Sequence, residues 1–258
     1  MDVLGRALGQ LDLFLLLFSR VIGLFVTAPV LGNPSIPAQL RVALAMAVAL
    51  LALPAAGGVR LPDSLPALAP LALRELVIGM VLGFVPTLLL AAVQFAGEIL
   101  DVDLGFSIVS TLDPLNQQPL PLLGNFQYLL ALLFFLAVDG HHGLLLTVLG
   151  SFRLLPAGAP PGDLAGLDRH VLALAGEIFR LGLSLAAPVL VALFLTTVAI
   201  AVVGRAVPQM NVFVVGLPVK TGAGLALLAA LVPLYAAAFR TLFERMLAQT
   251  QVALELLR

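Results

Sequence analysis

The segment Asp139-Gly140-His141-His142 has the residue types that come closest to a reactive or metal-binding site. One carboxylate and two imidazoles this close together could ligate zinc or exchange protons. Neighbouring histidines point in different directions on a helix, however, and neither the HxxxH nor the HExxH spacing is present. Gly140 and the following Gly143 favour a turn or a helix break instead. We therefore predict no metal site here, and a membrane hydrolase is the weakest functional hypothesis.

Nucleophilic chemistry has equally little support in the sequence. Ser107, Ser110 and Ser151 lie in no GxSxG elbow and have no base at a useful spacing. The chain contains no cysteine, which excludes disulfides, thiol catalysis and cysteine-based metal sites. We predict a protein that is not an enzyme and that needs no cofactor.

Charged residues inside apolar sequence are the other candidates for chemistry. They are Arg20, Arg74, Glu75, Glu177, Arg180 and Lys220. A charge at the centre of a bilayer costs about 2.5–3.5 kcal/mol on insertion scales, so such groups pair or face a cavity. Glu177 and Arg180 have the spacing of neighbours on one helix face. A proton or ion relay would suit a secondary transporter, but contacts between subunits are favoured because a relay needs more carboxylates at mid-span.

Composition defines the elements that must position these residues. Hydrophobic residues make up 61% of the 258 positions and charged residues 10%, against about 25% charged in soluble domains. Six apolar blocks are long enough, or nearly so, to cross the bilayer. They are Leu13–Leu31, Arg41–Ala56, Leu68–Val93, Leu122–Leu155, Val171–Val203 and a block ending near Phe239. We predict one all-α domain over 1–258, a polytopic membrane protein of kinked helical hairpins.

Helix-breaking residues and the distribution of charge refine this topology. The fourth block is broken around Asp139, so it is a broken helix or two short helices. Residues 240–258 have an apolar stripe and predict an amphipathic helix for a membrane interface or a partner. The basic residues favour six crossings with both termini in the cytoplasm, and the N-terminus shows no cleavable signal. A net charge of -1 without a basic run gives no indication of nucleic-acid binding.

A loop predicted at 97–121 separates the third and fourth blocks. Its first part carries Glu98, Asp101 and Asp103, and it has no lysine or arginine. An apolar run then lies between a hinge at Gly105 and a second hinge at Asp113 and Pro114. The apolar tip residues are Phe106, Ile108, Val109 and Leu112. The tip is either a plug across a channel, with the carboxylates keeping its stalk solvated, or a re-entrant loop packed against neighbouring helices.

Two further segments have the residue types of helix-contact sites. Gly79 and Gly83 lie on one helix face and would let another backbone approach closely. Between Pro208 and Lys220, prolines and a glycine interrupt helix on both sides of the apolar run Val212–Val215, while Gln209 and Asn211 can bond the backbone groups that this frees. That segment is either a tight turn between hairpin helices or an ordinary loop.

Several short motifs together resemble one family. They are QFAGE at 94–98, GF at 105–106, DP at 113–114, DGH at 139–141, SF at 151–152 and PQMNVF at 208–213. Their order and spacing over nearly the whole chain resemble FliR, the flagellar export-gate family, whose injectisome counterparts are the SctT family. The segment PQMNVFVVGLPVK is the most specific piece. The doubled His141-His142 departs from the expected single histidine.

The resemblance implies a structural channel subunit of the flagellar type III export gate. It implies a helical hetero-oligomer with FliP-like and FliQ-like subunits, an FlhB-like switch protein, unfolded export substrates and membrane lipids. It places the chain in the bacterial inner membrane, at the flagellar basal body, and favours the plug for the loop tip. Family assemblies are lifted out of the bilayer plane, so apolar blocks need not all be spans. The expected subunit-docking residues are Gly79, Gly83, Glu177, Arg180, Pro208, Gln209, Asn211, Phe213, Gly216 and Pro218.

Overall fold

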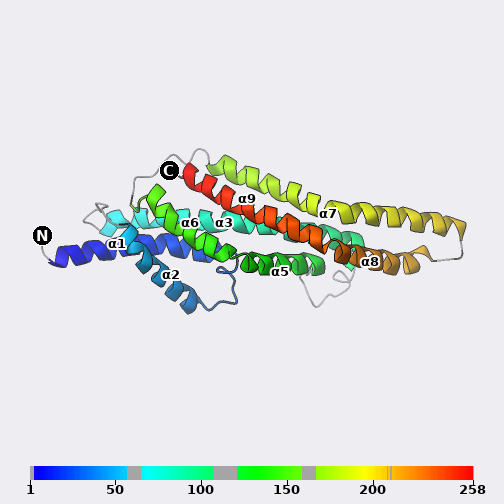
Figure 1. Cartoon of the computed structure of the whole chain (residues 1–258), viewed down its shortest axis with the longest axis horizontal. Coiled ribbons are helices and arrows are strands. Elements are labelled where there is room, and N and C mark those ends of the chain that lie inside the picture. The colour runs from blue at the N-terminus through cyan, green and yellow to red at the C-terminus, as the bar shows by residue number, and fades with distance from the viewer. Residues whose placement is uncertain are drawn as a thin grey trace. The chain divides into compact units, whose positions relative to one another are not determined.

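A computed structural model of the chain describes residues 3–56, 65–106, 121–158, 167–207, 209 and 211–257. Each regular element in these ranges is helical, as predicted (Figure 1). The helices are α1 (Val3–Thr27), α2 (Ala38–Ala52), the 3-10 turn η1 (Leu53–Ala55), α3 (Leu65–Leu104), α5 (Leu122–Ala137), α6 (Gly140–Leu154), α7 (Leu167–Ala206), α8 (Val212–Ala230) and α9 (Val232–Leu256).

The chain divides into two compact units, which are described separately. Unit 1 consists of Met1–Leu88, Phe135–Leu174 and Phe243–Arg258. Unit 2 consists of Leu89–Phe134 and Ala175–Leu242. The long helices α3, α7 and α9 each contribute to both units.

Glycines bring α1 and α3 together in unit 1. A Cβ added at Gly79 would overlap the backbone carbonyl of Arg20, and one at Gly83 would overlap Thr27 Oγ1. Gly23 on α1 makes the reciprocal approach, to the carbonyl of Leu76. The close backbone contact expected from this spacing is therefore present, but its partner is α1 of the same chain. This corrects the subunit-docking role predicted for Gly79 and Gly83.

The predicted break in the fourth block is present between α5 and α6. The two helices are bent by 65°. Asp139 lies at the break in the left-handed region, with φ 56°. The following Gly140 lies so close to the ring of Phe135 that a Cβ there would overlap it. A small residue is therefore required where the chain turns.

A second bend of 59° separates α8 from α9. Pro233, the second residue of α9, lacks an amide proton and disfavours helix at the residue before it, which explains a break here. The predicted amphipathic segment 240–258 is the later part of α9. Its apolar stripe is buried in unit 1: the ring of Phe243 packs on that of Phe135, and Ala253 joins a cluster with Val85. This stripe is covered by its own chain, which corrects the interface or partner role predicted for it.

Membrane-length helices confirm a polytopic membrane protein, although fewer spans are found than the six predicted. In the described ranges, three segments are long and apolar enough to cross a bilayer: Gly9–Thr27, Pro66–Leu104 and Arg169–Ala206. The number rises to five if each bent helix pair counts as one span. The second block is the difference, because α2 has only 15 residues, about 22 Å at 1.5 Å per residue.

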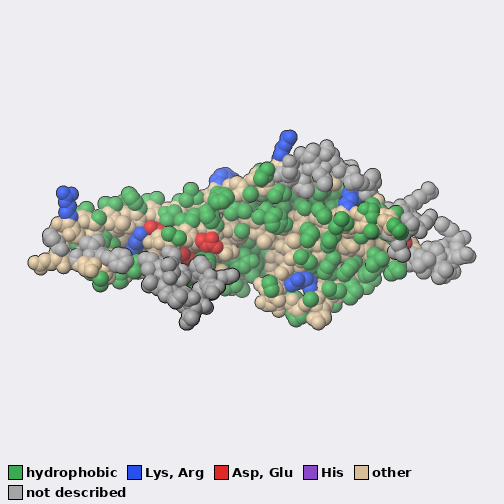
Figure 2. Space-filling model, turned by 180° about the vertical axis from the view of Figure 1, so that it is seen from behind, with side chains coloured by type: hydrophobic (Ala, Val, Ile, Leu, Met, Phe, Trp, Pro, Cys, Tyr) green, Lys and Arg blue, Asp and Glu red, His purple; other side chains and the backbone are tan. Residues whose placement is uncertain are grey.

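Much of the described surface is apolar. Figure 2 shows one face on which hydrophobic side chains predominate and charged side chains are few and scattered. Helix α7 exposes large hydrophobic side chains along most of its length, including Leu172, Phe179, Leu183, Val191, Phe194, Leu195 and Val202. A contiguous apolar surface of this kind is typical of contact with lipid or with other subunits.

Candidate functional site: the base of the loop after α3

The helix α3 continues into the segment predicted as a loop. It ends at Leu104, so residues 97–104 are helical rather than part of the loop. Gly105 follows with φ 84°, a conformation that favours glycine and ends the helix. Phe106 then packs against the apolar cluster of unit 2. The predicted tip and second hinge, Ile108, Val109, Leu112, Asp113 and Pro114, lie outside the described residues.

Asp101 connects the end of α3 to the start of α5. Its side chain is only 3% exposed. Its carboxylate accepts hydrogen bonds from the amides of Leu123 (3.0 Å) and Gly124 (3.1 Å). The first amides of a helix have no partner within the helix, and a carboxylate there is also favoured by the helix dipole. Asp101 therefore caps α5 and does not keep a loop stalk solvated, which corrects our prediction.

Two glycines allow the helices to approach at this cap. A Cβ on Gly97 of α3 would lie 2.6 Å from the Cα of Gly124 on α5. Real side chains do not tolerate that distance to backbone, so position 97 needs glycine. A Cβ on Gly124 would lie 2.9 Å from Glu98 Cγ, so a side chain there would require Glu98 to move. The sequence analysis missed Gly124, because its partner lies 27 positions earlier in the chain. The available signal was the pair of small residues flanking the predicted loop.

A second ion pair connects the end of α3 to α8. Lys220 Nζ lies 2.8 Å from Asp103 Oδ1, and both side chains are partly buried. The hydroxyl of Thr221 donates to the carbonyl of Leu104 at 3.1 Å, satisfying an acceptor at the end of α3. Lys220 was predicted to contact another subunit or line a relay. Its partner in the structure is Asp103 of the same chain.

These contacts define the loop base, which we take as Gly97, Asp101, Asp103, Gly124 and Lys220. Beneath it lies an apolar cluster formed by Ala96, Leu100, Leu104, Leu123, Ala186, Val189 and Leu193. The loop base fixes the chain on both sides of segment 107–120 within one compact unit. Its carboxylates accept backbone or ammonium hydrogen bonds, so the arrangement positions a segment and gives no indication of catalysis.

A separate polar cluster is buried in unit 1. Arg20 has no exposed area; its Nε donates to Glu75 Oε2 at 2.6 Å and its Nη1 donates to Ser151 Oγ at 2.9 Å. The guanidinium also lies 4.4 Å from the ring centroid of Phe152. Glu75, equally buried, accepts from the amide of Gly158 at 3.2 Å. This Arg20 cluster connects α1, α3 and α6 inside the chain, which corrects the subunit contacts predicted for Arg20 and Glu75.

The pair Glu177–Arg180 lies on one face of α7, as the spacing predicted. Arg180 Nη2 is 2.6 Å from Glu177 Oε1, and the arginine side chain is 68% exposed. The pair lies on the helix that exposes much apolar surface. Its docking role stays a prediction.

The segment after α7 is described only in part. Pro208 lies outside the described residues, and nothing can be placed for the side chain of Phe213. Asn211 Oδ1 accepts from the amide of Val214 at 3.3 Å, so Asn211 caps α8. Gly216 is buried, and a Cβ there would lie 3.2 Å from Ile200 of α7. The remaining predicted docking residues, Gln209 and Pro218, are exposed.

The structure does bring Asp139, His141 and His142 together, which the sequence analysis did not expect. One ligand atom from each residue lies within 4.8 Å of the others. Asp139 lies at the α5–α6 break and both histidines lie in the first turn of α6, and Asp139 and His142 are exposed. A solvated turn with these residues would have this arrangement without a metal, so we assign no site to it.

The chain is all-α, has several helices of membrane-spanning length and holds the ends of segment 107–120 in place through the loop base. These features define a polytopic membrane protein whose candidate site positions a chain segment. The family described as "Bacterial export proteins, family 1" matches residues 11–246. The chain is 37% identical to the flagellar biosynthetic protein FliR of Bacillus subtilis (strain 168) over 213 residues, 80% of this chain and 81% of that protein.

A second relative agrees over a longer stretch. The flagellar biosynthetic protein FliR of Escherichia coli (strain K12) is 34% identical over 240 residues, 92% of this chain and 90% of that protein. The chain therefore belongs to the FliR family of bacterial export proteins, and the family resemblance found in the sequence is confirmed.

Proposed function

We propose that the chain is a structural channel subunit of the flagellar type III export gate, which helps to form and seal the pore for unfolded substrates. Family membership supports the coarser part of this proposal, a membrane-embedded component of the flagellar export apparatus. The proposed partners are FliP-like and FliQ-like subunits and an FlhB-like switch protein. The proposed location is the bacterial inner membrane, in the basal body.

The loop base is the observation that carries the sealing role. Asp101 holds the first amides of α5, and Lys220 holds Asp103 at the end of α3. The described residues on both sides of segment 107–120 are therefore held at fixed points in unit 2. An apolar tip presented into a narrow pore excludes water and thereby blocks ions. We propose this role for Ile108, Val109 and Leu112, with hinges at Gly105, Asp113 and Pro114. Phe106, which was also predicted for the tip, packs against the cluster beneath the loop base instead.

The rival function, a secondary transporter, gains no support from the buried charges. Such a transporter needs charged groups that line a water-filled path. Arg20 and Glu75 have no exposed area and form an ion pair with each other. Their geometry is that of a structural ion pair.

The test replaces Ile108, Val109 and Leu112 together by serine in cells that express the whole gate. Phe106 is left in place because it packs against the cluster beneath the loop base. We expect normal assembly and an inward leak of ions and small solutes, measured as conductance or solute-driven swelling. Replacing the three residues by other apolar residues of similar size is the matched control and should stay tight. A serine variant that assembles and is as tight as the wild type would show that this loop is not the seal.

A further inference from the structure

Helix α1 carries a charge near the middle of its membrane-length segment. Among the three such segments in the described ranges, Gly9–Thr27 has the lowest mean hydropathy, and Arg20 lies close to the middle of its 19 residues. An arginine at the centre of a membrane helix shifts the insertion equilibrium about a hundredfold against the membrane. By itself, α1 is therefore a poor membrane span.

A carboxylate on α3 compensates the charge of Arg20. Arg20 Nε donates to Glu75 Oε2 at 2.6 Å, and neither residue has any exposed area. Between these two residues the sequence contains one other carboxylate, Asp63, which precedes α3. Glu75 is therefore the first carboxylate within an apolar helix that the growing chain offers to Arg20.

The other neighbours of Arg20 do not neutralise it. Its Nη1 donates to Ser151 Oγ at 2.9 Å, and its guanidinium lies 4.4 Å from the ring centroid of Phe152. Both residues are uncharged, and both come from α6, much later in the chain. Arg74 Nη1 lies 3.5 Å from Glu75 Oε1, the carboxylate oxygen that Arg20 does not use. In the described part of the chain, the ion pair of Arg20 is the one with Glu75.

The contacts between α1 and α3 show that the two helices run parallel within unit 1. Arg20 contacts Glu75, whereas Thr27, further along α1, donates from Oγ1 to the carbonyl of Met80 at 2.9 Å. The hydroxyl of Thr87 in turn donates to the carbonyl of Thr27 at 2.7 Å. Two parallel spans cannot emerge as one hairpin, because the chain between them must first return to the starting side. Helix α1 therefore precedes its charged partner during synthesis.

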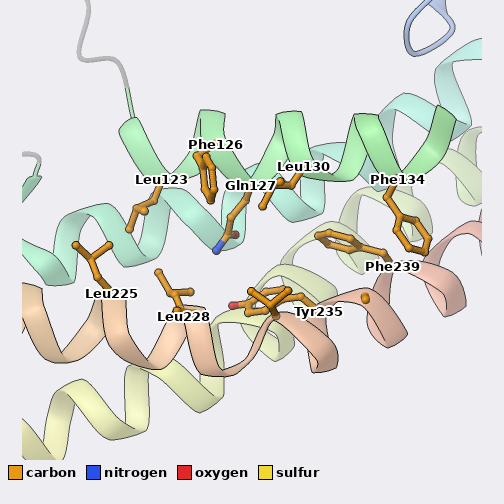
Figure 3. Close-up of a pocket in the computed structure, with 12 residues that line it drawn as sticks. Leu123, Phe126, Gln127, Leu130, Phe134, Leu225, Leu228, Tyr235 and Phe239 are labelled. Carbon is orange, nitrogen blue, oxygen red and sulfur yellow. The ribbon is translucent and has the colours of Figure 1, made fainter. Parts of the chain in front are cut away.

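The helices of unit 2 come together without such a charge. Figure 3 shows Phe126 and Leu130 of α5 facing Leu228 of α8 across an apolar groove. Gln127 and Tyr235 supply the polar side chains in its lining, and no acidic or basic side chain is among the residues that line it. The need for a partner of opposite charge therefore distinguishes the contact of α1 with α3 from this one.

We propose that α3 anchors α1 in the membrane, so that α1 crosses the bilayer stably only after Glu75 has neutralised Arg20. The close backbone approach at Gly23 and Gly79 then holds the two helices together as one inserted unit. The proposal concerns how the chain enters the membrane, and it does not depend on the proposed sealing function.

The test determines on which side of the membrane each end of α1 lies in the full chain, expressed without other gate subunits. The natural chain has no cysteine, so Gly9→Cys and Ser35→Cys each provide a single reactive thiol at an exposed position. A Cβ at Gly9 meets nothing within 4 Å. A membrane-impermeant maleimide is added to intact and to lysed spheroplasts after a short pulse of synthesis, before misinserted chains are degraded.

We expect the two thiols to react from opposite sides of the membrane in the otherwise wild-type chain. In Glu75→Leu, the ratio of crossing to non-crossing α1 should fall about ten- to a hundredfold, and both thiols should then react from the same side. This substitution makes α3 more apolar, so a loss of α1 cannot be blamed on α3. The matched control Glu98→Leu removes another carboxylate of α3, one that accepts from Gln94, and should leave α1 in place.

The double variant Arg20→Leu and Glu75→Leu separates insertion from packing. It lacks the ion pair and also the hydrogen bond from Arg20 to Ser151, so the packing around α1 is not restored. The charge is nevertheless gone, and we therefore expect α1 to cross as in the wild type.

Four results would overturn the proposal: an α1 that does not cross in the wild type, wild-type labelling of Glu75→Leu, same-side labelling of the double variant, or equal losses for Glu75→Leu and Glu98→Leu. No gate is assembled in this assay. Its failure therefore leaves the sealing proposal untouched, and a serine-loop variant that stays tight leaves this proposal untouched.

Discussion

The helices α3 and α7 look alike in sequence and differ in their surroundings. Each has 40 residues, contains proline and has the same mean hydropathy over its membrane-length segment. Yet within an 18-residue apolar window of each segment, 56% of the residues are buried in α3 and only 17% in α7. Hydropathy therefore measures how well a helix avoids water and gives no information about whether protein covers it.

Small and polar residues account for the difference. In α3, Gly79 contacts α1, and Glu75 and Asp101 are buried with hydrogen-bond partners. In α7, an added Cβ at Gly176 would meet nothing within 4 Å, and the pair of Glu177 and Arg180 lies near the surface. Other segments of the same chain cover much of helix α3 and supply its hydrogen-bond partners. Helix α7 presents an apolar surface that lipid or other subunits must cover.

Neutralising the buried carboxylate on α3 should have the largest effect. Glu75→Gln leaves Arg20 charged and without its ion-pair partner, at zero exposure. Breaking a buried pair in this way costs about 3–5 kcal/mol. We expect the folded fraction of the purified chain to fall sharply in a detergent unfolding titration.

The matched change on α7 is Glu177→Gln. Its arginine partner is 68% exposed, and surface pairs contribute about 0–1 kcal/mol, so the unfolding midpoint should barely move. Equal losses for Glu75→Gln and Glu177→Gln would contradict the contrast between the two helices.

Substituting a glycine of α3 should have the next largest effect on stability. Gly79→Ala forces a Cβ into the backbone of α1, and overpacking of this kind costs about 1–3 kcal/mol. Gly176→Ala on α7 enters open space and should leave stability unchanged or slightly raised, since alanine favours helix by about 1 kcal/mol. Thermal unfolding in detergent distinguishes the two. A Gly79→Ala protein as stable as the wild type would mean that α1 and α3 do not need their close approach.

Substituting the two aspartates at the end of α3 should change stability by smaller amounts, and the two costs should lie closer together. Asp101→Asn keeps the shape but removes the charge that caps α5, and losing a helix cap costs about 0.5–2 kcal/mol. Asp103→Asn affects a partly exposed pair with Lys220 and should cost less than about 1 kcal/mol. Amide exchange at Leu123 and Gly124 measures the cap directly, and it should rise only in Asp101→Asn. Faster exchange in Asp103→Asn alone would show that Asp101 is not the cap.

The apolar blocks, the glycine and proline breaks and the spacing of charges were enough to predict the fold class, the break at Asp139 and the pairing of Glu177 with Arg180. Each of these is local: it depends on residues within a few positions of one another. The family was also predictable, because its motifs recur in order along the chain.

Long-range pairings were not predictable from one sequence. Asp101 looked like a solvated carboxylate because its partners, the amides of α5, begin 22 positions later. Arg20 and Glu75 are 55 positions apart, so each looked like an isolated charge needing another subunit. Nothing local distinguishes a carboxylate in water from one that caps a distant helix. The tip of the predicted seal lies outside the described residues, and its role stays a proposal.

The smallest effect on the chain itself should come from the exposed face of α7. Phe194 and Val202 are 66% and 64% exposed, and substituting such residues usually changes stability by less than about 0.5 kcal/mol. The double variant Phe194→Ala and Val202→Ala should therefore unfold like the wild type when the chain is alone. If subunits cover this face in the assembly, truncation removes apolar area from their contact, and less chain should be recovered with the co-expressed gate subunits by affinity purification. The buried Leu193→Ala is the control, because it should lower chain stability and recovery together. Wild-type recovery of the double variant would assign this face to lipid, and the contrast between α3 and α7 would then be one between protein and bilayer as the covering medium.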